Sequence, residues 1–600
     1  MTIASNFPAI KPSLMLDFAN TKRLDPRVTF TRATTGTYYD GVTTAKAEEN
    51  LLLQSQDFTT SWTAEDVTIT ANTEVAPDGT TTADTITENT ANTDHRVKST
   101  SISFVSGQSY VISVFAKNGD ADFIQIVTPS ALGSKYANFD IDTGVVGSYS
   151  TDTATITSVG NNWYRLVITA TATSTTSVDF SIGLADSSSL GRLTPYTGTS
   201  RFAYIWGAQV EQRSSVTSYT ATTTQPITNY IPVLLTAASG VPRFDHNPTT
   251  DESLGLLIEE QRTNLLTYSA EFDNAAWIKT RANITANTIV APDGTLTGDK
   301  FYDDSTASAT HNIGQSTSFT SGTTYTFSIY AKIGERNLFR VVLPSAAFGT
   351  AVAYNFDLSA GTTTLVTAGT GNTSSITAVG NGWYRCVVTA QATSTTSGSP
   401  ALFLVNVNTI TYTGDGYSGI FIWGAQLEAG AFPTSYIATT SATVTRNADV
   451  ATMTGTNFSS WFNNAEGTVY AESTLNGSNT SRELMYINDG TANNNIFLRW
   501  SSGALAQASV TVGGVNQVSI APAGYSTIGV SYKRIFAYKV NDFEQAINGT
   551  SVGTDTSGLI PVVSQLNFAA TTNINLCGTI KKIAYYPLRL TSAQLQALTS

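Results

Sequence analysis

A tryptophan and an arginine two residues apart occur at the same place in two long stretches of the chain. Trp163-Tyr-Arg165 recurs as Trp383-Tyr-Arg385, and Phe115 and Tyr330 hold corresponding places upstream. Sugars bind proteins by stacking their apolar faces on aromatic rings while polar side chains hold the hydroxyls. The alternation of side chains along a strand puts these residues on the face opposite the core. We therefore predict a glycan platform formed by Phe115, Trp163, Arg165, Tyr330, Trp383 and Arg385.

The alternative for Trp163 and Trp383 is a strand-start residue packed under a loop, with the arginine lying over the ring. In the last third of the chain, Trp500 is a further candidate for glycan contact. The sequence predicts a packed position for this residue equally well. Trp206 and Trp423 share a strand face with Ala and with Val or Leu, which predicts that both lie in the core.

Two common signatures of catalysis are missing from the sequence, which contains no H-E-x-x-H and no C-x-x-C motif. Gly414-Asp-Gly-Tyr-Ser-Gly419 satisfies G-x-G-x-x-G, but a predicted strand follows it, whereas a dinucleotide site needs a helix there. His95 and His311 have different neighbours in the two stretches, and we expect both on the surface or in loops. We predict no catalytic residues and a protein that is not an enzyme.

Composition indicates the elements that must carry these residues. Only 13% of the 600 residues are charged, about half the usual share, whereas strand-favouring Thr, Val, Ile, Tyr and Phe are abundant. This predicts an all-β fold. A net charge of −12 with few basic clusters argues against nucleic-acid binding. The sequence has no run of about 20 apolar residues and no signal-peptide pattern at its start, so we expect neither membrane insertion nor general secretory export.

A duplication organises most of the chain. Asn50–Phe58 recurs as Asn264–Phe272, and Ile156–Arg165 recurs as Ile376–Arg385. Within each copy, short alternating segments separated by Asp-Gly, Ser-Gly and Asn-Gly turns are typical of an antiparallel sandwich. The predicted division is an N-terminal prelude (1–45), copy 1 (46–225), a connector (226–263), copy 2 (264–440) and a third strand-rich domain (441–600).

Several strings in the chain resemble a widespread group of tailed-bacteriophage and prophage virion proteins. These strings are Arg243–Pro248, Glu252–Leu266, Ile422–Glu428, Ala431–Tyr436, Asp489–Asn494 and Ile580–Leu590. The resemblance covers most of residues 24–600. It implies that both copies are jelly rolls similar to carbohydrate-binding modules, and that 441–600 is a concanavalin A-like (laminin G-like) sandwich. It also makes residues 1–45 a candidate virion-attachment segment.

Jelly-roll modules often hold a structural calcium ion through oxygen ligands near the ends of the domain. Asp57 and Glu271 hold corresponding places in the two copies, as do Glu211 and Glu428. These four carboxylates are the candidate calcium ligands, and the alternative is that they are simply solvated. No other cofactor is expected.

The resemblance implies a non-enzymatic fibre or appendage protein of a phage virion that contacts host-surface glycans during adsorption. Alternatives are a capsid or tail decoration protein that binds other virion subunits and, third, a polysaccharide depolymerase. We expect a homo-oligomer, a trimer by analogy with fibres. Its location would be the virion, assembled in the host cytoplasm and released by lysis.

Overall fold

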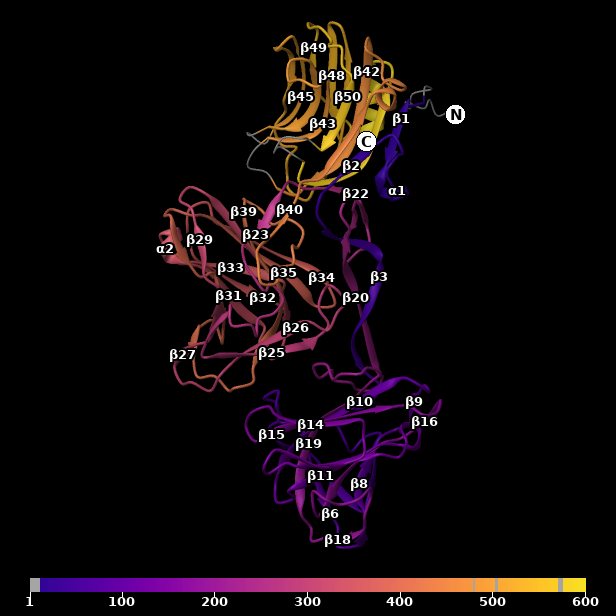
Figure 1. The fold of residues 1–600 in the computed structure, drawn as a ribbon, viewed down its shortest axis with the longest axis vertical. Coiled ribbons are helices and arrows are strands. Elements are labelled where there is room, and N and C mark those ends of the chain that lie inside the picture. Colours follow the sequence, from indigo (N-terminus) through magenta and orange to yellow (C-terminus); the bar gives the residue numbers. More distant parts are fainter. Residues whose placement is uncertain (1–10, 478–480, 502–504, 570–575) are drawn as a thin grey trace.

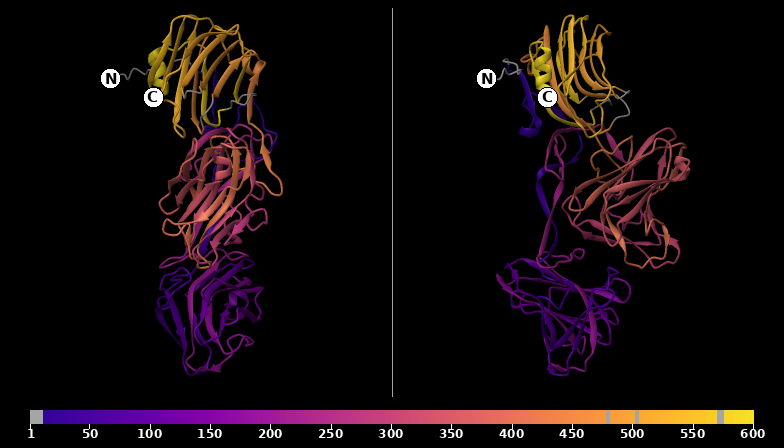
Figure 2. Two further views of the ribbon diagram at one scale, coloured as in Figure 1. Left: turned by 90° about the vertical axis from the view of Figure 1, so that its left-hand side faces the viewer. Right: turned by 180° about the vertical axis from the view of Figure 1, so that it is seen from behind.

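The computed structural model describes residues 11–477, 481–501, 505–569 and 576–600, and most of its regular structure is strand. Copy 1, copy 2 and a C-terminal sandwich follow one another along the long axis (Figures 1 and 2). The predicted all-β, antiparallel sandwich fold is confirmed. The described helices are short: α1 (Phe18–Thr21), α2 (Ser345–Phe348), α3 (Thr456–Ser459) and α4 (Ser592–Thr599).

Copy 1 packs two antiparallel sheets face to face. The first has the order β14 (Thr153–Ser158), β15 (Trp163–Thr171), β10 (Ser109–Asn118), β19 (Phe202–Glu211), β6 (Ala83–Glu88) and β5 (Val67–Glu74). The second has the order β13 (Val145–Tyr149), β12 (Tyr136–Asp140), β11 (Phe123–Val127), β17 (Ser181–Ala185), β8 (His95–Lys98) and β4 (Thr63–Glu65). The core between them is built from alternate residues such as Tyr110, Ile112 and Val114 of β10, as expected for strands with one buried face.

Copy 2 repeats this topology strand for strand. Its first sheet has the order β34 (Thr373–Gly380), β35 (Trp383–Gln391), β30 (Thr324–Ile333), β39 (Gly419–Ala429), β26 (Gly298–Asp303) and β25 (Ala282–Ile289). Its second has the order β33 (Thr362–Thr367), β32 (Val352–Asp357), β31 (Leu338–Leu343), β37 (Ala401–Leu404), β28 (Asn312–Gly314) and β24 (Ile278–Thr280). Cys386 lies in this core with no exposed surface, where Leu166 lies in copy 1. The duplicated sequence therefore gives a duplicated fold.

The C-terminal sandwich is assembled from distant parts of the chain. One sheet contains β21 (Phe244–His246), β22 (Ser253–Ile258), β51 (Gly578–Tyr586), β42 (Glu466–Leu475), β47 (Ser531–Lys539), β48 (Asp542–Ile547) and β49 (Thr550–Asp555), with β1 (Leu14–Asp17) also paired to β51. The other contains β2 (Thr29–Thr31), β41 (Val450–Thr454), β50 (Gln565–Ala569), β43 (Arg482–Asn488), β44 (Asn495–Trp500), β45 (Ala506–Val512) and β46 (Val515–Ile520). Segments assigned by sequence to the prelude and the connector thus supply strands to this domain.

A two-stranded ribbon of β3 (Gly36–Asn50) and β20 (Ile227–Ala237) links copy 1 to the rest of the molecule. The ribbon runs beside copy 2 (Figure 1) and packs against it through Tyr39, Ile231 and Leu234. An isolated two-stranded ribbon is only marginally stable in water. The contact with copy 2 therefore supplies a hydrophobic face that the ribbon needs.

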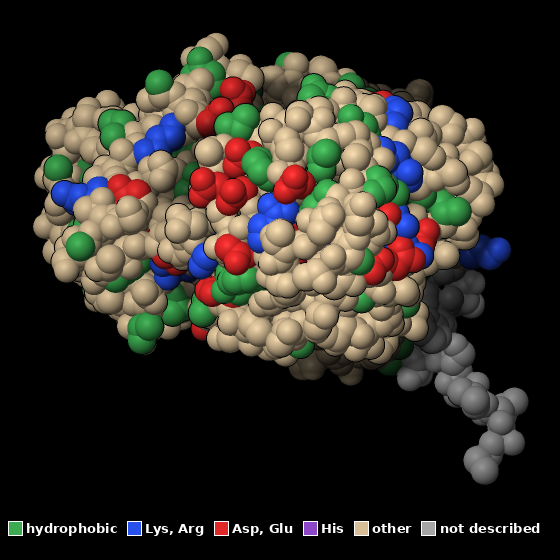
Figure 3. All heavy atoms as spheres, turned by 90° about the horizontal axis from the view of Figure 1, so that it is seen from below, with side chains coloured by type: hydrophobic (Ala, Val, Ile, Leu, Met, Phe, Trp, Pro, Cys, Tyr) green, Lys and Arg blue, Asp and Glu red, His purple; other side chains and the backbone are tan. Residues whose placement is uncertain are grey.

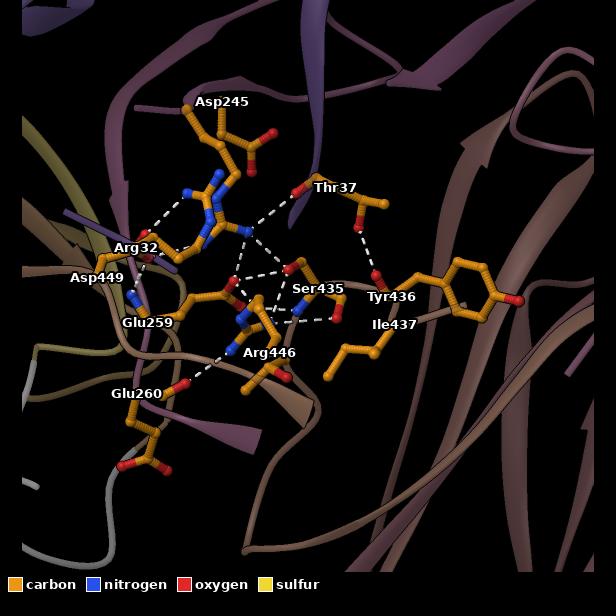
Figure 4. A network of polar contacts seen from close by, with 12 residues as sticks. Arg32, Thr37, Asp245, Glu259, Glu260, Ser435, Tyr436, Ile437, Arg446 and Asp449 are labelled. Atoms are coloured by element: carbon orange, nitrogen blue, oxygen red, sulfur yellow. Dashed lines mark hydrogen bonds and ion pairs between the residues drawn. The ribbon is translucent and has the colours of Figure 1, made fainter. Parts of the chain in front are cut away.

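Buried charges lie where copy 2, the ribbon and the C-terminal sandwich meet (Figure 4). We call Arg32, Arg243, Arg446, Glu259 and Asp449 the junction cluster. Asp449 accepts hydrogen bonds from Arg32 Nη1 at 2.9 Å and from Arg243 Nη2 at 2.7 Å, and Glu259 lies 2.7 Å from Arg243 and 2.9 Å from Arg446. Desolvation opposes ionisation of Glu259, but the two arginines prevail and lower its pKa to about 2. Charges from segments far apart in sequence therefore fix this junction.

Candidate functional site

The predicted glycan residues lie on the outer face of the first sheet in each copy, as expected from the alternation. Phe115 of β10 is paired with Arg165 of β15 and with Trp206 of β19. The rings, however, are buried: Trp163 is 1% exposed and Trp383 is fully buried. Because a sugar needs an accessible ring face, Phe115, Tyr330, Trp163 and Trp383 do not form an open platform.

The arginines and tryptophans of this layer are held by contacts within each copy. Trp163 Nε1 donates to Val75 O at 3.0 Å and Trp383 Nε1 donates to Val290 O at 3.1 Å. The guanidinium groups lie over a neighbouring ring, Arg165 over Phe115 at 5.2 Å and Arg385 over Tyr330 at 5.5 Å. The alternative of a packed tryptophan thus describes the structure, except that each arginine covers the aromatic residue on the adjacent strand.

Trp206 and Trp423 belong to the same outer layer, and not to the core between the sheets. The pairing of β10 with β19 shifts register between Ser113 and Phe115, and the residue after Trp206, Gly207, has a φ of +62°. A bulge of this kind moves the following residues to the opposite face. The prediction of a core position was therefore wrong, and the glycine inside the strand pattern was the available signal. We call the layer of Phe115, Trp163, Arg165, Trp206 and Tyr219, and its counterpart in copy 2, the aromatic wall.

The ribbon covers the aromatic wall of copy 2. Tyr39 and Leu234 pack with Tyr330, Trp383, Trp423 and Tyr436. Leu234 N donates to Pro292 O at 2.7 Å, and Thr37 Oγ1 donates to Tyr436 O at 2.8 Å. A Cβ atom at Gly294 would lie 2.9 Å from Val233, whereas at its counterpart in copy 1, Gly79, no atom lies within 4 Å. The two walls are therefore similar in sequence, but the ribbon covers only the wall of copy 2.

The aromatic wall of copy 1 borders a cleft of about 670 Å³ that lies between the two copies. Copy 1 contributes Phe115, Thr155, Thr157, Arg165, Trp206 and Tyr219, and copy 2 contributes Thr285, Asn287, Lys300, Tyr302, Glu335 and Tyr417. The modules contact each other at its border, where Ser218 N donates to Thr288 O at 2.9 Å. The cleft therefore combines one wall of aromatic and arginine side chains with a second wall of hydroxyl, amide and charged groups.

The charged groups of the cleft are arranged around aromatic rings. Lys300 Nζ lies 3.5 Å from the centre of the Tyr417 ring and donates to Glu335 Oε1 at 2.8 Å. Burial lowers the pKa of Lys300, and it also lowers the pKa of Arg165, which donates to Thr217 O at 2.7 Å. Burial raises the pKa of the Tyr417 hydroxyl well above its usual value. Both side chains carry N–H groups, so the cleft has hydrogen-bond donors on both walls.

The carboxylates that line the cleft are already engaged. Glu48 accepts hydrogen bonds from Asn381 Nδ2 at 2.7 Å and from Lys332. Asp78 accepts from Thr80 N at 2.9 Å, and Glu335 from Lys300. Each of these three carboxylates therefore already has a hydrogen-bond donor within the chain.

The candidate calcium ligands do not converge. Asp57 accepts hydrogen bonds from Thr59 and Thr60 in its own turn, and Glu271 is exposed. Glu211 is buried and accepts from Thr217 N at 3.1 Å, as Glu428 does from Thr434 N at 2.9 Å. No group of three or more His, Cys, Asp or Glu in the described residues is placed to hold a metal ion. These residues therefore do not fit a calcium site.

Trp500 is fully buried in the C-terminal sandwich and donates from Nε1 to Tyr525 O at 2.8 Å. Arg534 lies over its ring at 4.9 Å. His95 and His311, expected on the surface or in loops, are also buried, each beside a tyrosine ring. His95 lies in strand β8, whereas His311 lies outside the strands. None of these side chains is accessible to a glycan.

Searches for relatives gave no match to a protein-family model and no significant match to a curated protein. Among solved structures, the chain is similar to the CBM40 module of Ruminococcus gnavus IT-sialidase bound to α2,3-sialyllactose. The identity is 14%, the match covers 24% of this chain and 88% of the module, and the TM-score is 0.22. The tandem CBM22 domains of Paenibacillus barcinonensis Xyn10C match at 12% identity over 64% of this chain and 98% of theirs, with a TM-score of 0.18.

The LG1–3 region of the laminin α2 chain matches at 9% identity over 82% of this chain and 95% of its own length, with a TM-score of 0.20. Likenesses at this level carry no argument about what the chain binds. Within the described residues, no helix has the length and hydrophobicity needed to cross a bilayer.

Proposed function

We propose that the chain is a non-enzymatic glycan-binding protein and that an oligosaccharide occupies the cleft between the two copies. The observation that carries this proposal is the cleft itself, which places hydroxyl and amide groups opposite a wall of aromatic and arginine side chains. Its volume lies in the range of about 300 to 1,000 Å³ that is usual for ligand pockets. Tyr302 and Tyr417 are partly exposed there and offer ring faces for stacking.

The surface around the site is also suited to an uncharged polyhydroxyl ligand. Thr155, Thr157 and Asn287 are exposed at the cleft, and their side chains donate and accept hydrogen bonds without a net charge. Seen from below, the end of the molecule formed by copy 1 shows acidic and basic groups interspersed among uncharged ones (Figure 3). Such a surface gives little long-range electrostatic steering.

The finer proposal is a fibre or appendage protein of a phage virion that contacts host-surface glycans. Its support is the resemblance of strings such as Glu252–Leu266 and Ala431–Tyr436 to virion proteins. A homo-oligomer, proposed as a trimer, would present several weak sites on one particle, and linked weak sites gain avidity without new contacts. The virion is the proposed location.

A decoration protein that binds other virion subunits is the second candidate. The ribbon on copy 2 favours it, because this contact is an example of the aromatic wall binding a polypeptide. In copy 1 the same wall borders the cleft. A protein ligand and a glycan would then compete for one place, and a binding experiment separates them.

The test is a steric block with a matched control. Thr157 of β14 is exposed and lines the cleft, and its counterpart Thr377 of β34 is exposed outside it. We expect Thr157→Trp to weaken binding to a glycan array and to host cells at least tenfold, and Thr377→Trp to leave it unchanged. Equal binding by the two variants contradicts the cleft as the site. Release of free oligosaccharide by the wild-type chain would instead indicate a depolymerase.

A further inference from the structure

A second group of side chains suited to a polar ligand lies on the outer face of the sheet that contains β43 and β44. The register pairs Glu483 with Arg499 and Tyr486 with Phe497. The residues between them, Leu484 and Met485 of β43 and Leu498 of β44, belong to the core. Arg499 also pairs with Gln507 of β45, and Tyr486 with Asn567 of β50. These side chains therefore form a compact array across four adjacent strands.

Glu483 is the unusual member of this array. It is only 8% exposed, and in the described part of the chain its carboxylate accepts no hydrogen bond and lies in no ion pair. Arg499 faces it across the strands, but the Arg499 Nε donates to Gln507 Oε1 at 2.7 Å and the guanidinium lies over Phe497 at 4.5 Å. A mostly buried carboxylate without a partner is costly to the fold. Such groups mark candidate ligand sites.

The aromatic pair beside Glu483 has one partly exposed member, Tyr486, on the outer face of the sheet. The rings of Tyr486 and Phe497 lie 6.3 Å apart with 33° between their planes. Tyr486 remains partly exposed, whereas Phe497 is 8% exposed. Helix α4, which covers an outer face of this sandwich, packs on β47 and β48 of the opposite sheet. A ring face, an acceptor without a partner and a guanidinium group thus lie together.

We propose that Glu483, Arg499, Tyr486 and Phe497 form a second glycan site, which binds a neutral sugar residue. Two neighbouring hydroxyls of the sugar would donate to the Glu483 carboxylate, the Arg499 guanidinium would donate to a further oxygen, and the Tyr486 ring would contact the apolar face. An acidic sugar is disfavoured, because its carboxylate would approach Glu483. The ligand class rests on the proposed function, but the residues are independent of the cleft.

The test uses Glu483→Gln in the full chain, on an array that carries neutral, amino and acidic oligosaccharides. Glutamine keeps the size of the side chain, removes the charge, and is expected to fold at least as well as the wild type. We expect it to weaken binding of neutral glycans at least tenfold. Glu472→Gln, in the other sheet of the same sandwich, is the control and should bind as the wild type does.

A pH series gives a readout that a purely structural role would not change. Burial raises the pKa of Glu483 to about 7, and the groups that face it are Arg499 and Tyr486, with Asp489 close enough to influence Tyr486. Wild-type binding of neutral glycans should weaken as the pH falls from 8 to 6, because the carboxylate becomes protonated. The Glu483→Gln variant should bind equally at both values.

The outcomes separate the two proposals. Loss of neutral-glycan binding in Glu483→Gln supports the second site, whether or not Thr157→Trp also loses binding. Loss of only amino-sugar binding overturns the ligand class and indicates a cation site. If Glu483→Gln binds glycans as strongly as the wild type and Thr157→Trp loses glycan binding, the second site is overturned and the proposed function stays intact. If the wild-type chain retains no glycan on the array, both proposals fail.

Discussion

Phe18 tests whether the N-terminal segment is part of the C-terminal sandwich. Its side chain is 1% exposed and lies 5.9 Å from Phe568 and 6.3 Å from Phe244, measured between ring centres. Replacing a buried phenylalanine by alanine typically costs about 3–5 kcal/mol, because hydrophobic burial is lost and a cavity remains. At about 2–4 °C per kcal/mol for a domain of 150–250 residues, the melting transition of the sandwich should fall by about 6–20 °C.

The measurement is differential scanning calorimetry of wild type and Phe18→Ala. We expect the transition of the C-terminal sandwich to move and the transition of copy 1 to stay, because Phe18 contacts nothing in that module. Met15 on the adjacent strand β1 is 45% exposed and supplies the control, since exposed substitutions usually change stability by no more than about 0.5 kcal/mol. A Phe18→Ala protein that melts with the wild type would refute the assignment of β1 and α1 to this core.

Two further outcomes follow from buried charges. Asp449→Asn should destabilise the junction by about 3–5 kcal/mol in urea unfolding, because Arg32 and Arg243 lose their shared counter-ion. Asp273→Asn is the control and should change little, because Asp273 is exposed. Equal midpoints for the two variants would show that the junction cluster does not hold the domains. The pKa of Glu483 is about 7 in the folded chain and near 4.5 when unfolded, so its contribution to stability falls by about 3 kcal/mol as the pH rises from about 4.5 through 7. Glu483→Gln should therefore be more stable than wild type at pH 8 and equal at pH 4.5 in urea unfolding, and a constant difference would contradict this.

The sequence allowed the all-β class and the duplication to be predicted, because alternation and repeated strings can both be read directly from the order of the residues. Period-two alternation in segments such as Tyr325–Ala331 reports one buried face, and the repeated strings report a repeated fold. The pairing of β1 with β51 has no such signal. Leu14 pairs with Tyr585, and a short apolar segment near the start of a chain carries no information about a partner so far away in sequence. Residues 1–45 therefore looked like a separate prelude.

The glycan prediction shows the same division between local and distant information. Alternation correctly placed Phe115 and Arg165 on the outer face of their sheet, but it did not show that Trp163 is buried within its own module or that the ribbon covers the wall of copy 2. Burial of an outward-facing ring depends on other segments, which no strand pattern reports. Trp500 shows a second limit of predicting faces from alternation. It faces the core, whereas its neighbour Arg499 faces outward, so an error of one residue in the phase of the strand reverses the prediction.

The distribution of charge explains how a chain with few charged residues fixes the relative positions of its domains. Arg32, Glu259 and Asp449 come from three separate passages of the chain through the junction. Each is buried with a partner of opposite charge from another passage: Arg32 with Asp449, and Glu259 with Arg446. A buried charge left without its partner costs several kcal/mol, so an arrangement that lacks any one passage is disfavoured. The N-terminal segment, the connector and the linker after copy 2 must therefore assemble together. Once they have done so, the ribbon is directed along copy 2 and copy 1 is brought to the place where the cleft forms.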